Sequence, residues 1–150
     1  MKFEQNRVLQ EFDRINNTIS EFYHEINVRQ GLSDSAYEIL QAILILGDGC
    51  TQTEIIKYSL LNKQTVNSSV KKLKADGYIE FLKGNGREVK LHLTSCGKEL
   101  VNEKILPILQ AENEVFQEMT EDEQREILRL MSKYLDNFRD KVITMMGGVI

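Results

Sequence analysis

The 150-residue sequence predicts a mainly helical α+β fold, in which two short strands interrupt a series of amphipathic helices. Over most of the chain, apolar residues recur at steps of three and four, the spacing of one helix face. Apolar and polar residues alternate, as they do in half-buried strands, at residues 78–82 and 89–93. There is a single proline and no tryptophan, which also favours a mostly helical chain.

The first two predicted helices are bounded by glycine and serine. The first covers about residues 4–29 and ends at Gly31. Its apolar stripe consists of Val8, Phe12, Ile15, Ile19, Phe22, Tyr23 and Ile26. Ser33 caps a second helix over about residues 34–46, and the glycines of segment 47–49 break the chain after it.

Two short helices and a hairpin follow. The helices are expected at about residues 52–58 and 63–76, and Asn62 caps the second of them. The strands at 78–82 and 89–93 flank a turn that contains glycine. Two helices joined by a short turn and followed by a basic hairpin form a winged helix-turn-helix, which we place at residues 33–93.

The second of these short helices presents a face that suits DNA. Small polar and basic side chains at a helix N-terminus fit the base edges and phosphates of a major groove. A merely solvated face would more often carry Glu, Lys or Ala, which favour the helix more strongly. The residues predicted to contact DNA are Gln52, Lys63, Gln64, Thr65, Asn67, Ser68, Lys71 and Lys72, with Asn85 and Arg87 in the hairpin turn.

The charge distribution agrees with a nucleic-acid partner, although the whole chain carries a net charge of −4. Residues 54–98 hold nine Lys or Arg against four Asp or Glu, a net charge of +5. The remaining residues hold ten against nineteen, a net charge of −9. A basic middle within an acidic frame is typical of a nucleic-acid footprint.

The C-terminal part predicts two long helices. Thr94 caps a helix over about residues 95–118, which Pro107 should bend, and Thr120 with Glu123 forms a capping box before a helix that reaches about residue 142. The tail after it is expected to fray.

Apolar stripes on long helices need a cover, and a second copy of the chain is the simplest one. Residues 1–32 and 94–150 are therefore predicted to be dimerisation helices. The predicted interface residues are Phe12, Ile15, Tyr134, Leu135 and Phe138.

Other functional classes find little support in the sequence. We find no nucleophile–base–acid set, no phosphate-binding loop and no metal motif, so we expect neither an enzyme nor a cofactor. His24 with Glu21 or Glu25 supplies too few ligands for a metal site. The absence of a long apolar run and of a signal-peptide pattern favours a cytoplasmic protein without a membrane span.

Four segments, spread over nearly the whole chain, share the pattern of a known family. They are Thr51–Ile55, Asn62–Val66, Lys72–Ile79 and Leu93–Lys98. Together with the order of elements, they resemble the MarR family of bacterial transcription regulators. The wing tip departs from the family's common Asp-x-Arg, because Asn85-Gly86-Arg87 stands there in a shorter loop.

The resemblance implies a homodimeric repressor that binds pseudo-palindromic double-stranded DNA and is released by a small aromatic or anionic effector. Relatives often bind such compounds in a crevice between the dimerisation helices and the winged helix, where Phe22, Tyr23 and Tyr37 are expected. Two alternatives remain open. One is a winged helix used for protein contact, and the other is a cysteine-based redox-responsive regulator that uses Cys50 or Cys96.

Overall fold

The computed structural model describes residues 3–86 and 88–148. It contains two compact units, residues 1–107 and residues 108–150, and each is described by itself. The predicted mainly helical winged-helix fold is confirmed. Within the described residues, no helix is both long and apolar enough to cross a membrane.

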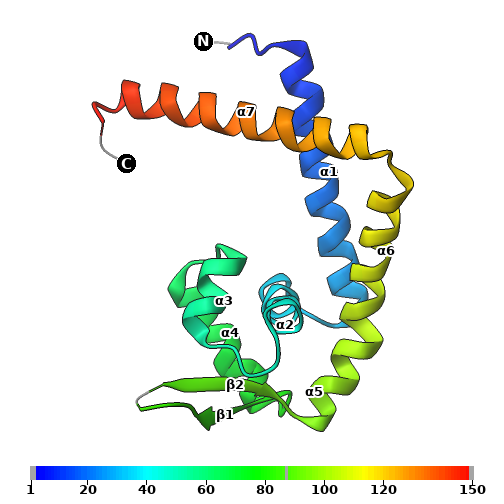
Figure 1. The fold of residues 1–150 in the computed structure, drawn as a ribbon, viewed down its shortest axis with the longest axis vertical. Helices are drawn as coiled ribbons and strands as arrows, with labels where there is room; N and C mark the ends of the chain where they lie inside the picture. The colour runs from blue at the N-terminus through cyan, green and yellow to red at the C-terminus, as the bar shows by residue number, and fades with distance from the viewer. Residues whose placement is uncertain (1–2, 87, 149–150) are drawn as a thin grey trace. The chain divides into compact units, whose positions relative to one another are not determined.

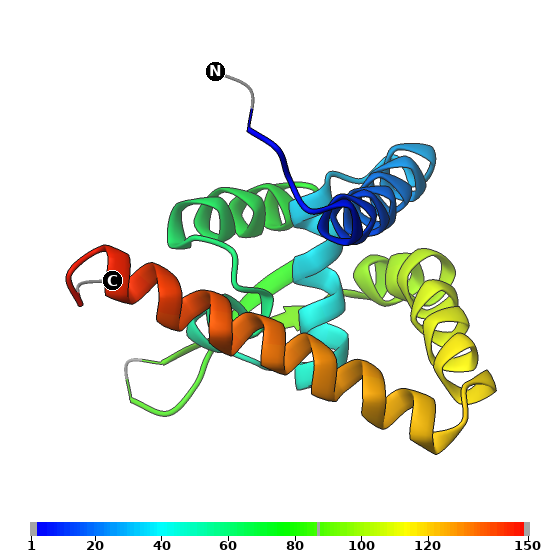
Figure 2. The same cartoon turned by 90° about the horizontal axis from the view of Figure 1, so that it is seen from above.

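Four helices form most of the first unit: α1 (Arg7–Gln30), α2 (Asp34–Leu46), α3 (Gln52–Ser59) and α4 (Lys63–Ala75). In both views α2 lies between α4 and α1 (Figures 1 and 2). The caps are local, because the Ser33, Thr51 and Asn62 side chains each accept a hydrogen bond from a backbone N–H at the start of their own helix. Gly31 ends α1 in the left-handed conformation, at φ 72°.

The hairpin consists of β1 (Ile79–Lys83) and β2 (Val89–Leu93), which pair antiparallel with Phe81 opposite Leu91. Thr51 makes an isolated bridge to Lys90, so the segment before α3 extends the sheet by one contact. This wing is thereby attached to the helix-turn-helix at the start of α3.

The core of the first unit gathers around α2. Its buried apolar residues come from every helix and strand of the winged helix and from the helical segment that follows it. They include Tyr37, Ile39, Leu40, Ile43, Ile55, Val66, Val70, Leu73, Ile79, Leu91, Val101 and Ile105. This set includes the seam of Val66, Val70 and Leu73 on α4. Because that seam is buried, the opposite face of α4 is turned to solvent.

The helix predicted at residues 95–118 contains a π-helical turn. Helix α5 (Ser95–Leu100) continues into η1 (Val101–Ile105) and then α6 (Leu106–Glu118). The Leu106 N–H bonds to the Val101 carbonyl, five residues back. Pro107 has no N–H, and its ring would crowd the preceding turn of a regular helix. The wider turn accommodates it, so the irregularity lies before the proline.

The second unit contains the rest of α6 and α7 (Glu121–Met145). The predicted capping box begins α7, because the Glu123 N–H donates to Thr120 Oγ1 and the Thr120 N–H donates to Glu123 Oε2. The helix ends at Met145 rather than near residue 142, so the prediction that the tail frays from Val142 was wrong by one turn.

Candidate nucleic-acid interface and effector cavity

Helix α4 is positioned by its cap and its buried seam. Asn62 Oδ1 accepts the Thr65 N–H at 2.8 Å, which begins the helix one residue after the turn. Ser69 Oγ lies 2.7 Å from Ser35 Oγ and ties α4 to α2. These contacts hold α4 against the core by one side and leave its other side exposed.

The predicted DNA-contacting residues of α3 and α4 divide into two groups. The exposed group comprises Lys63, Gln64, Ser68, Lys71 and Lys72. The half-buried group comprises Gln52, Thr65 and Asn67, and Gln52 Nε2 donates a hydrogen bond to Asn67 Oδ1. The Gln52–Asn67 bond links the two helices of the helix-turn-helix, a role that the sequence did not suggest.

The wing is attached to α4 by a cation–π contact. Lys74 Nζ lies 4.4 Å from the centre of the Phe81 ring. At the turn, the Gly84 N–H donates to the Glu88 carbonyl at 2.9 Å, and the exposed Asn85 accepts the Glu88 N–H through its own carbonyl at 3.2 Å. Arg87, the predicted wing contact, lies outside the described residues.

Asp48 joins three elements at the base of the wing. Its Oδ1 accepts the Leu93 N–H at 2.9 Å and lies 3.4 Å from His92 Nδ1, while its Oδ2 lies 3.5 Å from Lys98 Nζ. The carboxylate therefore connects the α2–α3 loop to β2 and α5. In the sequence Asp48 stands between two glycines and indicates only a break.

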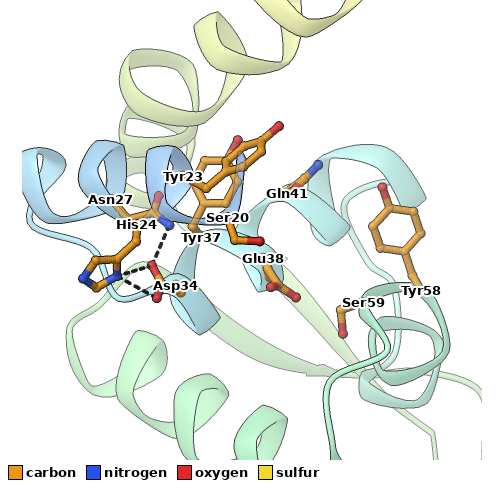
Figure 3. A pocket seen from close by; sticks show the side chains of 10 residues that line it. All are labelled: Ser20, Tyr23, His24, Asn27, Asp34, Tyr37, Glu38, Gln41, Tyr58 and Ser59. Atoms are coloured by element: carbon orange, nitrogen blue, oxygen red, sulfur yellow. Dashed lines mark hydrogen bonds and ion pairs between the residues drawn. The ribbon is translucent and has the colours of Figure 1, made fainter. Parts of the chain in front are cut away.

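A cavity of about 450 Å³ lies among α1, α2 and α3. This volume is in the range of sites that bind small molecules. Figure 3 shows the ten side chains that line it, contributed by all three helices. They are Ser20, Tyr23, His24, Asn27, Asp34, Tyr37, Glu38, Gln41, Tyr58 and Ser59.

Of the three aromatic residues expected at an effector site, Tyr23 and Tyr37 line the cavity and Phe22 does not. The two tyrosine rings are tilted by 53°, with their centres 6.1 Å apart. Phe22 is 62% exposed.

His24 pairs with a carboxylate from α2 rather than with Glu21 or Glu25. Its Nδ1 lies 2.9 Å from Asp34 Oδ2. Asn27 Nδ2 donates to Asp34 Oδ1 at 2.9 Å, and these two bonds, that of Asn27 first, lower the pKa of Asp34. No group of three or more metal-ligating side chains occurs in the part of the chain that the structure describes.

Two further lining residues lack polar partners within the described ranges. The Tyr37 hydroxyl is buried without a hydrogen bond, and burial raises the pKa of this phenol. Glu38 makes no hydrogen bond or ion pair with a described residue. Burial, and then the Asp34 charge, raise the pKa of the Glu38 carboxyl. The sequence did not indicate that Glu38 lines a cavity, because a single acidic residue on a helix is usually exposed to solvent.

The two cysteines have opposite environments. Cys50 is buried and Cys96 is exposed. Burial, followed by the charge of Glu54, raises the pKa of the Cys50 thiol to about 11. Because the thiolate is the reactive form, burial and this pKa both protect Cys50 from oxidation and alkylation.

We expect a maleimide at pH 8 to label Cys96 in the folded protein and to leave Cys50 unmodified. The raised pKa lowers the thiolate fraction of Cys50 about a hundredfold relative to an ordinary thiol. Peptide mass spectrometry after timed labelling measures both sites, and denatured protein, in which both should react, is the control. Equal labelling of both thiols in the folded state would favour the redox-responsive alternative.

The predicted dimer residues lie on partly exposed apolar faces. On α1, Ile15 is 49% exposed and Phe12 is half-buried. On α7, Leu135 is 51% and Phe138 is 56% exposed, and the Tyr134 ring stacks on Phe138 with centres 6.0 Å apart. Exposed apolar residues gathered on one helix face are typical of an interaction surface.

Comparison with known proteins gives matches to sequence and fold. Residues 30–88 match the sequence model of the MarR family. A MarR family regulator from Neisseria meningitidis is similar over 94% of this chain and 99% of its own, at 26% identity and a TM-score of 0.71. No curated protein sequence matches significantly.

Two further structures share the fold. MepR of Staphylococcus aureus, in a complex with DNA, matches 90% of this chain and 99% of its own, with 18% identity and a TM-score of 0.67. BpsR of Bordetella bronchiseptica, whose DNA binding is regulated by 6-hydroxynicotinic acid, matches 89% of this chain and 98% of its own, with 19% identity and a TM-score of 0.65.

The matched segment runs from the end of α1 to the turn of the wing, and so includes the helix-turn-helix and its exposed α4 face. The fold match extends over nearly the whole length of both chains. Residues 30–88 therefore carry the sequence pattern of the MarR family, and the chain shares the fold of MarR family regulators.

Proposed function

We propose that the protein is a homodimeric repressor that binds pseudo-palindromic double-stranded DNA and is released by a small molecule bound among α1, α2 and α3. The exposed polar and basic face of α4, held by a buried seam on its other side, is the observation that carries this proposal.

Helix α4 would enter the major groove by its N-terminal half. Gln64 and Ser68 lie at the centre of the exposed face, where they can reach base edges, and Lys71 lies one turn further on, where it can reach a phosphate. The wing tip at Asn85 would lie along the flanking minor groove. That MepR has been captured with DNA on the same fold supports this assignment.

A dimer supplies the two-fold symmetry that the operator requires. The exposed faces of α1 and α7 would be covered by the same helices of a second copy, which places two recognition helices on one DNA molecule. Their half-sites should lie about one helical turn, roughly 10 bp, apart.

Effector control would act through the spacing of the two recognition helices. A ligand releases DNA only if it prefers a dimer whose helices are wrongly spaced for the operator. The break at Gly31 and the π-helical turn before Pro107 are the positions that can absorb such a change. Regulation of BpsR by a small molecule supports the presence of an effector.

Footprinting tests the central claim. The dimer should protect a two-fold symmetric site, and its affinity should fall as salt concentration rises, because phosphate contacts release counterions. Protection of a single isolated half-site by a monomer would contradict the proposal. Absence of any salt-dependent DNA binding would favour a winged helix that contacts protein.

Lys71→Ala is expected to weaken binding evenly across operator sequences and to reduce the slope of log affinity against log salt by about one unit. The physical reason is the loss of one phosphate contact without the loss of a base contact. Gel shifts at several salt concentrations on two operator variants measure both effects. Lys133→Ala on α7 is the control, because it removes the same charge outside the winged helix-turn-helix. A change in sequence preference would instead place Lys71 among the residues that read bases.

A further inference from the structure

The charges around the cavity do not suit an anionic ligand. Asp34 and Glu38 both line it, one turn apart on α2, and none of the described lysines or arginines does. His24 is the one basic side chain among the described residues that line it, and Asp34 already pairs with it. A carboxylate ligand would therefore meet two acidic side chains with no cation left to balance it.

The polar atoms without partners point to a hydrogen-bond donor. The Asn27 Oδ1 atom is buried and lacks a donor within the described ranges, while its Nδ2 is used by Asp34. Among the residues that the structure describes, the Tyr37 hydroxyl is likewise buried and unpaired, and Glu38 has no hydrogen-bond or ion-pair partner. An amide oxygen and a carboxylate both accept hydrogen bonds. A ligand that forms hydrogen bonds with both must therefore supply N–H or O–H donors.

The aromatic side chains add a second preference. Tyr23 and Tyr37 place tilted rings beside these acceptors, and Tyr58 lines the cavity from α3 (Figure 3). Aromatic faces attract cations, and the attraction is stronger where water is partly excluded. The tyrosine rings and the acceptor oxygens of Asn27 and Glu38 together favour the binding of a positively charged group.

We propose that this cavity binds a small organic cation, an ammonium or amidinium group carried on an aromatic or aliphatic body. Its N–H groups donate to the Glu38 carboxylate and to Asn27 Oδ1, and its body packs on the tyrosines. The inference rests on the proposed function for the role of the cavity as the effector site. It replaces the aromatic acid that the family resemblance implied.

Three matched probes test the ligand class directly. Benzylamine, benzoate and benzyl alcohol share one ring and differ in charge, and each is titrated into the full-length protein by calorimetry and thermal shift at millimolar concentration. We expect benzylamine to bind and to raise the melting temperature, and benzyl alcohol and benzoate to bind at least about tenfold more weakly. Equal or tighter binding of benzoate, or no binding of benzylamine, would overturn the inference.

Two variants locate the site. Glu38→Gln keeps the shape of the side chain and removes its charge, and should weaken benzylamine binding by at least about tenfold. Glu21→Gln removes one carboxylate from α1 outside the cavity and should leave the affinity unchanged. If both variants weaken binding equally, attraction by overall charge explains it and the cavity assignment fails.

DNA release is measured separately, with a labelled operator and the same probes. Benzylamine binding that depends on Glu38 upholds the ligand class whether or not DNA is released. Binding that leaves DNA affinity untouched would contradict effector control under the proposed function, and the two claims can therefore fail independently.

Discussion

Leu135→Glu is expected to convert the proposed dimer into monomers and to lower operator affinity by about a hundredfold or more, because a monomer engages a single half-site. Leu135 is 51% exposed on α7, beside the exposed Phe138. A second copy of the chain that covers this face would bury the new carboxylate among apolar groups at a cost of several kcal/mol. Light scattering at low protein concentration measures the mass, and a gel shift measures the affinity.

Lys133→Glu provides the matched control, since it places the same carboxylate on α7 on the side away from the apolar face. It should remain dimeric. Circular dichroism of both variants should report the same helix content, which separates dissociation from unfolding. A Leu135→Glu variant that stays a dimer would move the interface to another surface and remove the support that α7 gives to the proposed symmetry.

Gly97→Ala is expected to destabilise the first unit by about 3 kcal/mol or more, although alanine ordinarily favours a helix over glycine by about 1 kcal/mol. Gly97 is buried in α5, and a Cβ there would lie 1.9 Å from the Tyr78 carbonyl oxygen. That oxygen also accepts the Thr94 N–H at 3.1 Å. The added methyl group must therefore push α5 away from the end of α4 and the start of β1.

Urea unfolding monitored by circular dichroism measures this loss, with Glu99→Ala on the exposed side of α5 as the control. DNA affinity should fall with stability, because Asp48 and the wing are anchored at the same junction. An unchanged unfolding midpoint would show that α5 does not approach Tyr78 so closely.

Local signals in the sequence predicted most of the secondary structure. Asn62 and Thr120 cap helices through bonds to backbone groups three residues away, and Gly31 ends a helix by its own conformation. The alternation of residues 89–93 predicted β2 with its observed bounds. Such features involve residues within four positions of each other, so they can be read without knowledge of the packing.

The π-helical turn shows where local reasoning was incomplete. Pro107 predicted an irregular helix, and the structure places the wider turn at Val101–Ile105, whose ends are both buried. A helix can accommodate a proline either by a kink or by a wider π-helical turn. Here the π-helical turn forms, and we attribute this to the packing of Val101 and Ile105 into the core of the first unit.

The sequence by itself determined the order of elements, the polar and basic face of α4 and the family pattern, because these depend on periodicity, caps and charge along the chain. Only the tertiary structure decided which polar residues meet: Asp48 with Lys98, Gln52 with Asn67, and His24 with Asp34. It also showed that Glu38 lines the same cavity as Asn27 and Tyr37, whose buried oxygen atoms lack partners among the described residues. Each of these contacts joins separate elements, and the packing of α2 against its neighbours brings those elements together.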